Sequence, residues 1–147
     1  MDVVHSTFSL ERRYPTPVER VFAAWAEPQA RRRWMAQGAE HSQEFEVGGL
    51  ETVRGTDGEG RPLIYEAQYA QILPNERILT TSTLRTGEVL STVSVTSVEF
   101  RADGDGTVVL LTEHGMYLPG QEQPAWREQG TADQLDALAA EFAAASS

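Results

Sequence analysis

Residues 124–145 read PAWREQGTADQLDALAAEFAAA, and this stretch decides how the rest of the chain is interpreted. Leu135, Leu138 and Phe142 recur at spacings of three and four residues, which is typical of a helix with one apolar face. Alanine, a strong helix former, fills many of the other positions. The pattern predicts a long C-terminal helix that presents an apolar stripe to a partner surface.

The partner surface is expected in residues 41–116, which carry strand patterns separated by short turns. The pairs and quartets rich in glycine and aspartate at 48–49, 57–60 and 103–106 mark three of these turns. Loops this short predict that neighbouring strands pair antiparallel. The β-branched stretch 89–100 changes phase between Val93/Val95 and Val98/Phe100, which predicts a bulge there.

Ahead of these strands, residues 7–14 alternate as a first strand and a helix signal follows. Thr16 is expected to cap that helix, with Pro17 at its first position and Glu19 completing a capping box. A second short helix follows, and its three consecutive arginines at 31–33 are expected to form a solvated face.

The predicted element order is therefore one strand, two short helices, six strands and one long helix. This order predicts an α+β protein with an antiparallel sheet that has one apolar face, and the long C-terminal helix is expected to cover that face. A length of 147 residues predicts a single domain over residues 1–147.

Charge and cysteine content exclude several classes of function. The chain holds 22 acidic and 12 basic residues, all of the latter arginine, for a formal net charge of −10. Such an acidic chain is not expected to bind nucleic acid or an anionic membrane. Without cysteine it cannot hold a disulfide, a thiol nucleophile or an iron–sulfur cluster. No targeting segment or membrane span is recognised, so we expect a cytoplasmic protein.

Five stretches follow one another along the chain in a recognisable order: residues 14–34 (YPTPVERVFAAW and, later, RRW), 45–49 (FEVGG), 69–78 (YAQILPNERI), 112–120 (TEHGMYLPG) and 127–131 (REQGT). In this order they resemble one known family, the bacterial domains similar to the C-terminal domain of the activator of heat-shock protein 90 ATPase. That family belongs to the START-like (SRPBCC) superfamily, and the resemblance implies the helix-grip fold of the birch-pollen allergen, a curved antiparallel sheet wrapped around a long C-terminal helix. Two positions depart from the family pattern: Glu46 replaces an arginine and Pro119 an aspartate.

The resemblance implies the fold more strongly than a function, because superfamily members bind apolar ligands, cyclise polyketides or modulate chaperones. A sheet that grips one helix leaves room for a ligand between them. We expect the wall of such a cavity to include aromatic, aliphatic and small residues of the strands and helices: Trp34, Tyr65, Tyr69, Leu84, Leu110, Thr112, Met116, Gly130, Thr131, Leu135 and Leu138. The alternative is that these residues simply form the core.

Glu113 and His114 are the candidates for catalysis, and neither is assigned firmly. Because side chains alternate along a strand, only one of the two faces inward. A buried glutamate would act as an acid or base. The alternatives are an ion pair of Glu113 with a strand arginine or with Arg127, a solvent-facing Glu113, and a merely hydrogen-bonded His114.

No cofactor or metal site is predicted. His5, His41 and His114 are scattered rather than spaced as metal ligands. The glycine-rich turns lack the lysine of a phosphate loop and the spacing of a calcium loop.

The first functional hypothesis is a protein that binds a small apolar or aromatic molecule. The others are a modulator of a heat-shock chaperone ATPase and a cofactor-independent cyclase- or hydrolase-like enzyme. A homodimer is a further expectation left open by the sequence.

Overall fold

The computed structural model describes residues 2–145, with side chains given for residues 2–143. Its secondary structure follows the predicted order of one strand, helical segments, six strands and a long helix. The elements are β1 (Val4–Tyr14), α1 (Val18–Ala26), α2 (Pro28–Arg31), the π-helical turn η1 (Arg32–Ala36), β2 (Glu40–Gln43), β3 (Leu50–Thr56), β4 (Pro62–Leu73), β5 (Arg77–Thr86), β6 (Val89–Asp103), β7 (Gly106–Tyr117) and α3 (Pro124–Ala145).

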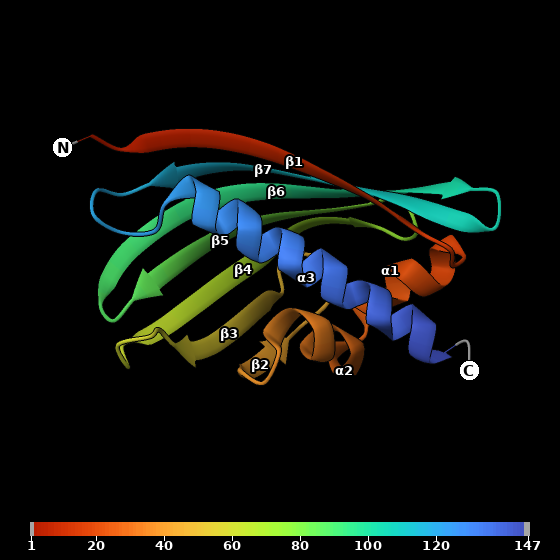
Figure 1. The fold of residues 1–147 in the computed structure, drawn as a ribbon, viewed down its shortest axis with the longest axis horizontal. Coiled ribbons are helices and arrows are strands. Elements are labelled where there is room, and N and C mark those ends of the chain that lie inside the picture. The colour runs from red at the N-terminus through yellow and green to blue at the C-terminus, as the bar shows by residue number, and fades with distance from the viewer. Residues whose placement is uncertain (1, 146–147) are drawn as a thin grey trace.

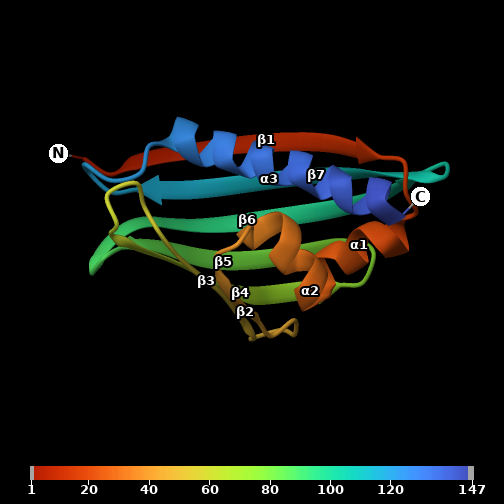
Figure 2. The same cartoon turned by 60° about the horizontal axis from the view of Figure 1, so that its bottom comes forward.

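The strands form one antiparallel sheet in the order β1-β7-β6-β5-β4-β3-β2. Helix α3 crosses one face of this sheet, and α1 and α2 lie on the same face (Figures 1 and 2). The two views agree that every helix lies on this face. This is the predicted helix-grip arrangement, with α3 as the gripped helix.

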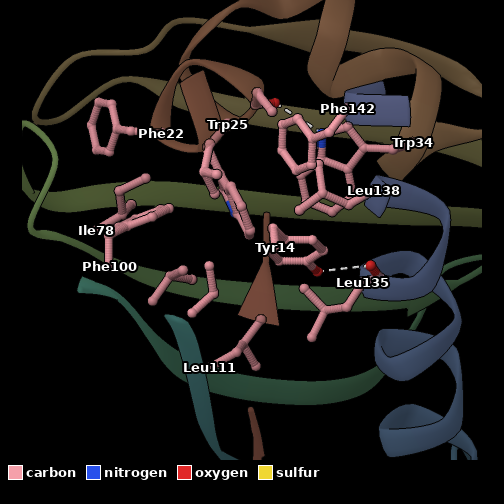
Figure 3. Close-up of a cluster of buried hydrophobic side chains, with 14 of the residues drawn as sticks. Tyr14, Phe22, Trp25, Trp34, Ile78, Phe100, Leu111, Leu135, Leu138 and Phe142 are labelled. Atoms are coloured by element: carbon pink, nitrogen blue, oxygen red, sulfur yellow. Dashed lines mark hydrogen bonds between the residues drawn. The ribbon is translucent and has the colours of Figure 1, made fainter. Parts of the chain in front are cut away.

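An aromatic cluster fixes the C-terminal part of α3 to the sheet and to α1 (Figure 3). Trp25 contacts the rings of Trp34 and Phe100 edge-on, with centroids 4.7 and 5.1 Å apart. The buried hydroxyl of Tyr14 donates to the carbonyl of Leu135 across 2.8 Å. Together with Leu138, which is fully buried, these contacts hold the second half of α3 in place.

Two local predictions at the first helix are corrected. Helix α1 begins at Val18 with Pro17 as its N-cap residue, and no side chain caps it. Thr16 instead lies buried against β7, where its carbonyl accepts a hydrogen bond from Thr107 Oγ1 at 2.7 Å. Thr16 is therefore a core residue, although the capping-box pattern predicted that it would cap the helix.

β6 does contain a bulge, but it lies at Ser91 and not between Val95 and Val98, where the sequence predicted it. β6 pairs with β7 without interruption from Thr92 to Asp103. Its irregularity against β5 lies earlier, where Leu84 pairs with Thr92 and Arg85 with Leu90. The apparent change of phase arises because valines such as Val95, 47% exposed, occupy the outer face.

Candidate functional site

A cleft of about 290 Å³ lies between the sheet and the N-terminal half of α3. The cleft-lining residues come from α1 to η1, from β3 to β7, from α3 and from the loop before it. Along each strand they alternate with outward-facing neighbours, as the pleat of a sheet requires. Elements that lie far apart in the sequence therefore line one cleft.

Seven of the eleven residues expected in a cavity wall line this cleft: Trp34, Tyr65, Tyr69, Leu84, Gly130, Thr131 and Leu135. Gly130 adds open space, since a Cβ built there would meet no atom within 4 Å. Leu138 lies outside the lining and is buried in the aromatic core instead.

The three remaining residues, Leu110, Thr112 and Met116, are not among the lining residues because they occupy the other face of β7. Thr112 bonds to Ser9 of β1 at 2.9 Å, and Met116 is 43% exposed. The inward set is Leu111 and Glu113. Both faces of β7 carry aliphatic residues, so the hydrophobic pattern of this strand alone did not identify the inner face.

The same alternation separates the two catalytic candidates. Glu113 is buried and lines the cleft. His114 is exposed on the outer face, where its Nδ1 lies 2.9 Å from Thr7 Oγ1.

Glu113 is held by Arg127 of α3, the pairing that the sequence left as an alternative. Arg127 Nε donates to Glu113 Oε2 at 3.0 Å, and Thr96 Oγ1 donates to Glu113 Oε1 at 3.0 Å. Arg127 Nη2 also donates to Ser94 at 3.1 Å. Both carboxylate oxygens are engaged, which is the arrangement of an ion pair that holds α3 to the sheet.

Glu122, just before α3, is a second partner of the same guanidinium. Arg127 Nη1 donates to Glu122 Oε1 at 3.2 Å, and Thr92 donates to the same oxygen at 2.7 Å. The amide of Glu122 donates to Ser91 Oγ at 3.2 Å. These bonds fix the loop that leads into α3, and sequence reasoning did not single out Glu122.

A second buried ion pair lines the other end of the cleft. Arg31 donates to both oxygens of Glu51 at 2.8 and 2.9 Å, and His41 Nε2 lies 2.9 Å from Glu51 Oε2. Burial would raise the pKa of Glu51, but the charge and hydrogen bonds of Arg31, helped by His41, lower it to about 2.

The prediction that arginines 31–33 form a solvated face is therefore wrong for the first of them. The side chain of Arg31 is only 12% exposed, and its guanidinium lies 4.8 Å from the ring centroid of Trp34. Arg33 follows the prediction: it is 60% exposed and pairs with Glu141. A carboxylate on a separate strand, Glu51, draws Arg31 inward, and no local pattern reports such a partner.

The two cleft tyrosines differ in their hydroxyl groups. Tyr69 accepts a hydrogen bond from Gln43 Nε2 at 2.7 Å, and burial raises its pKa. The Tyr65 hydroxyl forms no hydrogen bond with residues 2–143, and burial raises the pKa of Tyr65 as well. Arg127 lies 5.6 Å from the Tyr65 ring centroid. Tyr65 thus offers the cleft a free hydroxyl.

Neither a metal cluster nor a membrane helix is found in the part of the chain that the structure describes. No three of its His, Asp and Glu side chains gather in a way that could hold a metal ion. None of its helices combines the length and the hydropathy that crossing a bilayer demands.

Comparison with known sequences gives a family match over most of the chain. Residues 15–143 match the family described as activator of Hsp90 ATPase homolog 1-like protein. No curated protein matched the chain. The family match confirms the resemblance drawn from the five sequence stretches.

Solved structures of bacterial proteins match the whole fold. Mll3558 protein from Rhizobium loti is 40% identical, with a TM-score of 0.90 over 96% of this chain and 99% of its own. An uncharacterized protein from Rhizobium leguminosarum is 35% identical, with a TM-score of 0.90 over 94% of each chain. Protein CV1439 from Chromobacterium violaceum, at 23% identity and a TM-score of 0.75 over 91% of this chain and 95% of its own, shares the fold.

Proposed function

We propose that this chain, which belongs to the family of activator of Hsp90 ATPase homolog 1-like proteins and to the SRPBCC superfamily, binds a small apolar or aromatic molecule in the cleft beneath α3. The observation that carries the proposal is the combination of an unfilled volume of about 290 Å³ with a wall of aromatic and aliphatic side chains. Small-molecule sites in proteins start at roughly this size, about 300 Å³.

The wall favours a flat, apolar ligand. Trp25, Trp34 and Tyr69 contribute ring surfaces at one end, and Ile78 and Val98 contribute aliphatic surface from the sheet. Such surfaces gain free energy when a ligand displaces water from them, about 25 cal/mol per Å² of apolar area. The free hydroxyl of Tyr65 would orient one polar atom of the ligand.

The first half of α3, which covers the cleft, can open more readily than the second half. No residue from 124 to 134 is as deeply buried as Leu135, Leu138 and Phe142, whose exposed fractions are 1%, 0% and 6%. The first half of α3 is held mainly through Arg127, by hydrogen bonds and ion pairs. A segment with little buried apolar surface opens at lower free-energy cost than the core, which would give a ligand its entry path.

The geometry of the cleft gives less support to the two other hypotheses, the enzyme and the chaperone modulator. The enzyme hypothesis requires a free acid or base, and Glu113 is paired through both oxygens while His114 lies on the outer face. The chaperone hypothesis rests on the name of the family. Neither gains a specific observation in this chain.

Thermal unfolding in the presence of apolar metabolites, aromatic acids and lipids tests the proposal. A ligand at a hundredfold excess over its Kd stabilises the folded state by about 2.7 kcal/mol. In a domain of this size we expect a rise in Tm of several degrees, about 2–4 °C per kcal/mol. A saturable shift for one chemical class would support binding, and a flat response across the panel would contradict it.

A cleft-filling variant locates the site. Thr80 lines the cleft from β5, and Thr80→Phe should abolish the ligand-induced shift. The same substitution one residue later, Thr81→Phe, falls on the exposed face and should leave the shift unchanged. Equal loss in both variants would place the ligand elsewhere.

A further inference from the structure

The cleft carries more negative than positive charge. Its lining includes two arginines, Arg31 and Arg127, and three glutamates, Glu51, Glu113 and Glu122. Arg31 and Glu51 neutralise each other through two hydrogen bonds. Arg127 is shared between Glu113 and Glu122, so one negative charge at this end has no cation from the described residues to balance it.

Glu122 is where that charge is accessible. Its Oε1 accepts hydrogen bonds from Arg127 and Thr92, but Oε2 has none from any residue in the range 2–143. The side chain is 17% exposed, so it is partly withdrawn from water without being closed off. A partly desolvated carboxylate oxygen of this kind gains free energy from a cationic hydrogen-bond donor.

Trp126 lines the same cleft and adds a second recognition element for a cation. Its side chain is 63% exposed, which is unusual for a residue whose large ring is normally placed in a core. The face of an indole ring attracts ammonium groups more strongly than any other aromatic side chain does. Trp126 and Glu122 line the same cleft and lie four residues apart in the sequence, and packing does not explain the exposure of this tryptophan.

We propose that the ligand of this cleft is a cationic amphiphile, an apolar body with one protonated amine or quaternary ammonium group. This inference rests on the proposed function. The apolar body occupies the aromatic part of the cleft, and the cation lies at the end formed by Glu122 and Trp126. The formal net charge of −10 favours the approach of such a ligand over that of an anion.

Three probes of matched shape test the charge preference: 4-phenylbutylamine, 4-phenylbutan-1-ol and 4-phenylbutanoic acid, measured by isothermal titration calorimetry at pH 7. We expect the amine to bind about tenfold more tightly than the alcohol, and the acid to bind more weakly than the alcohol. If the alcohol or the acid binds as tightly as the amine, the inference is overturned while the proposed function stands. If none of the three binds, both are contradicted.

Two variants assign the preference to its residues. Glu122→Gln keeps an oxygen for Thr92 and Arg127, so it should remove the preference for the amine over the alcohol. Glu128→Gln, an exposed position of α3 outside the lining, removes the same charge and should keep the preference. Trp126→Leu should weaken the amine more than the alcohol. Retention of the amine preference in both Glu122→Gln and Trp126→Leu would place the cation elsewhere and overturn the inference.

Discussion

Two groups of arginine and glutamate side chains line the same cleft, and they differ in charge balance. At one end, Arg31 and Glu51 pair one to one, and Glu51 is 1% exposed. At the other, Arg127 is shared by Glu113 and Glu122, the latter 17% exposed, on a half-helix with no fully buried residue. The Arg31–Glu51 pair lies in the core. Arg127, Glu113 and Glu122 form a polar cluster, here called the clasp, that holds α3 over the cleft.

The difference indicates separate roles for similar chemistry. A buried charge is costly unless it is fully paired, so a one-to-one pair among aromatic rings serves the stability and specificity of the fold. A clasp with an unbalanced charge contributes less stability and leaves a group for a ligand to satisfy. The predictions below test this contrast, from the largest expected effect to the smallest.

Substitution of each arginine should show most clearly how much each end of the cleft contributes to the free energy of unfolding. Arg31→Met leaves Glu51 buried without its cation, and we expect a loss of about 3–5 kcal/mol in the free energy of unfolding, measured with urea. Arg127→Met should cost less, because the first half of α3 can move and expose Glu113 and Glu122 to water. As a control, Arg101→Met on the exposed surface should change stability by under about 0.5 kcal/mol. Equal losses at 31 and 127 would contradict the contrast.

Lowering the pH should destabilise the protein through protonation of Glu51, the partner of Arg31. Because folding lowers the pKa of Glu51 from 4.5 to about 2, its contribution is complete above pH 4.5 and is lost as the pH falls toward 2. The difference corresponds to roughly 3 kcal/mol of stability. In Glu51→Gln this part of the pH dependence should disappear, as followed by urea unfolding at a series of pH values. An unchanged acid slope in the variant would show that other carboxylates govern it.

The two tyrosines give a smaller contrast. Tyr69→Phe removes a hydroxyl that accepts from Gln43, and should cost about 0.5–1.5 kcal/mol. Tyr65→Phe removes a hydroxyl with no hydrogen bond to the described residues, and should stay within about 0.5 kcal/mol of the parent protein. Urea unfolding of both variants measures the difference. A larger loss at Tyr65 would mean that its hydroxyl is already satisfied in the protein.

Gly130→Ala should stabilise the loosely held half of α3. A Cβ at this position meets no atom within 4 Å, and alanine favours a helix over glycine by up to about 1 kcal/mol. We expect a gain of about 0.5–1 kcal/mol, seen as a rise in Tm, with ligand binding retained. A loss of stability would show that the backbone here is strained or that the helix is not formed at this position.

Much of the fold could be predicted from the sequence, because its signals are local. The apolar spacing of Leu135, Leu138 and Phe142 predicted the helix α3, and the glycine-rich turns separated the strands. Thr16 shows the limit of such signals, since its burial against Thr107 depends on a strand some ninety residues later.

The site was less accessible to sequence reasoning because it depends on pairings between distant elements. Glu51 draws Arg31 out of an apparently solvated arginine run, and Glu122 becomes relevant only beside Thr92 and Arg127. Along β7 the alternation of side chains was known, but aliphatic residues on both faces hid which face was inward. The register with neighbouring strands and the position of α3 supplied that missing fact.

Hydrogen exchange along α3 tests the contrast between the two ends most directly. We predict that amides 128–134 exchange through local opening, faster than amides 135–143, and that saturating 4-phenylbutylamine slows the first group selectively. Arg127→Met should speed the exchange of amides 128–134. Amides 135–143 should still exchange more slowly, at rates closer to that of global unfolding. If both groups exchange at one rate, set by global unfolding and unaffected by the amine, then α3 is held as a single unit and the account of a movable clasp over a binding cleft is wrong.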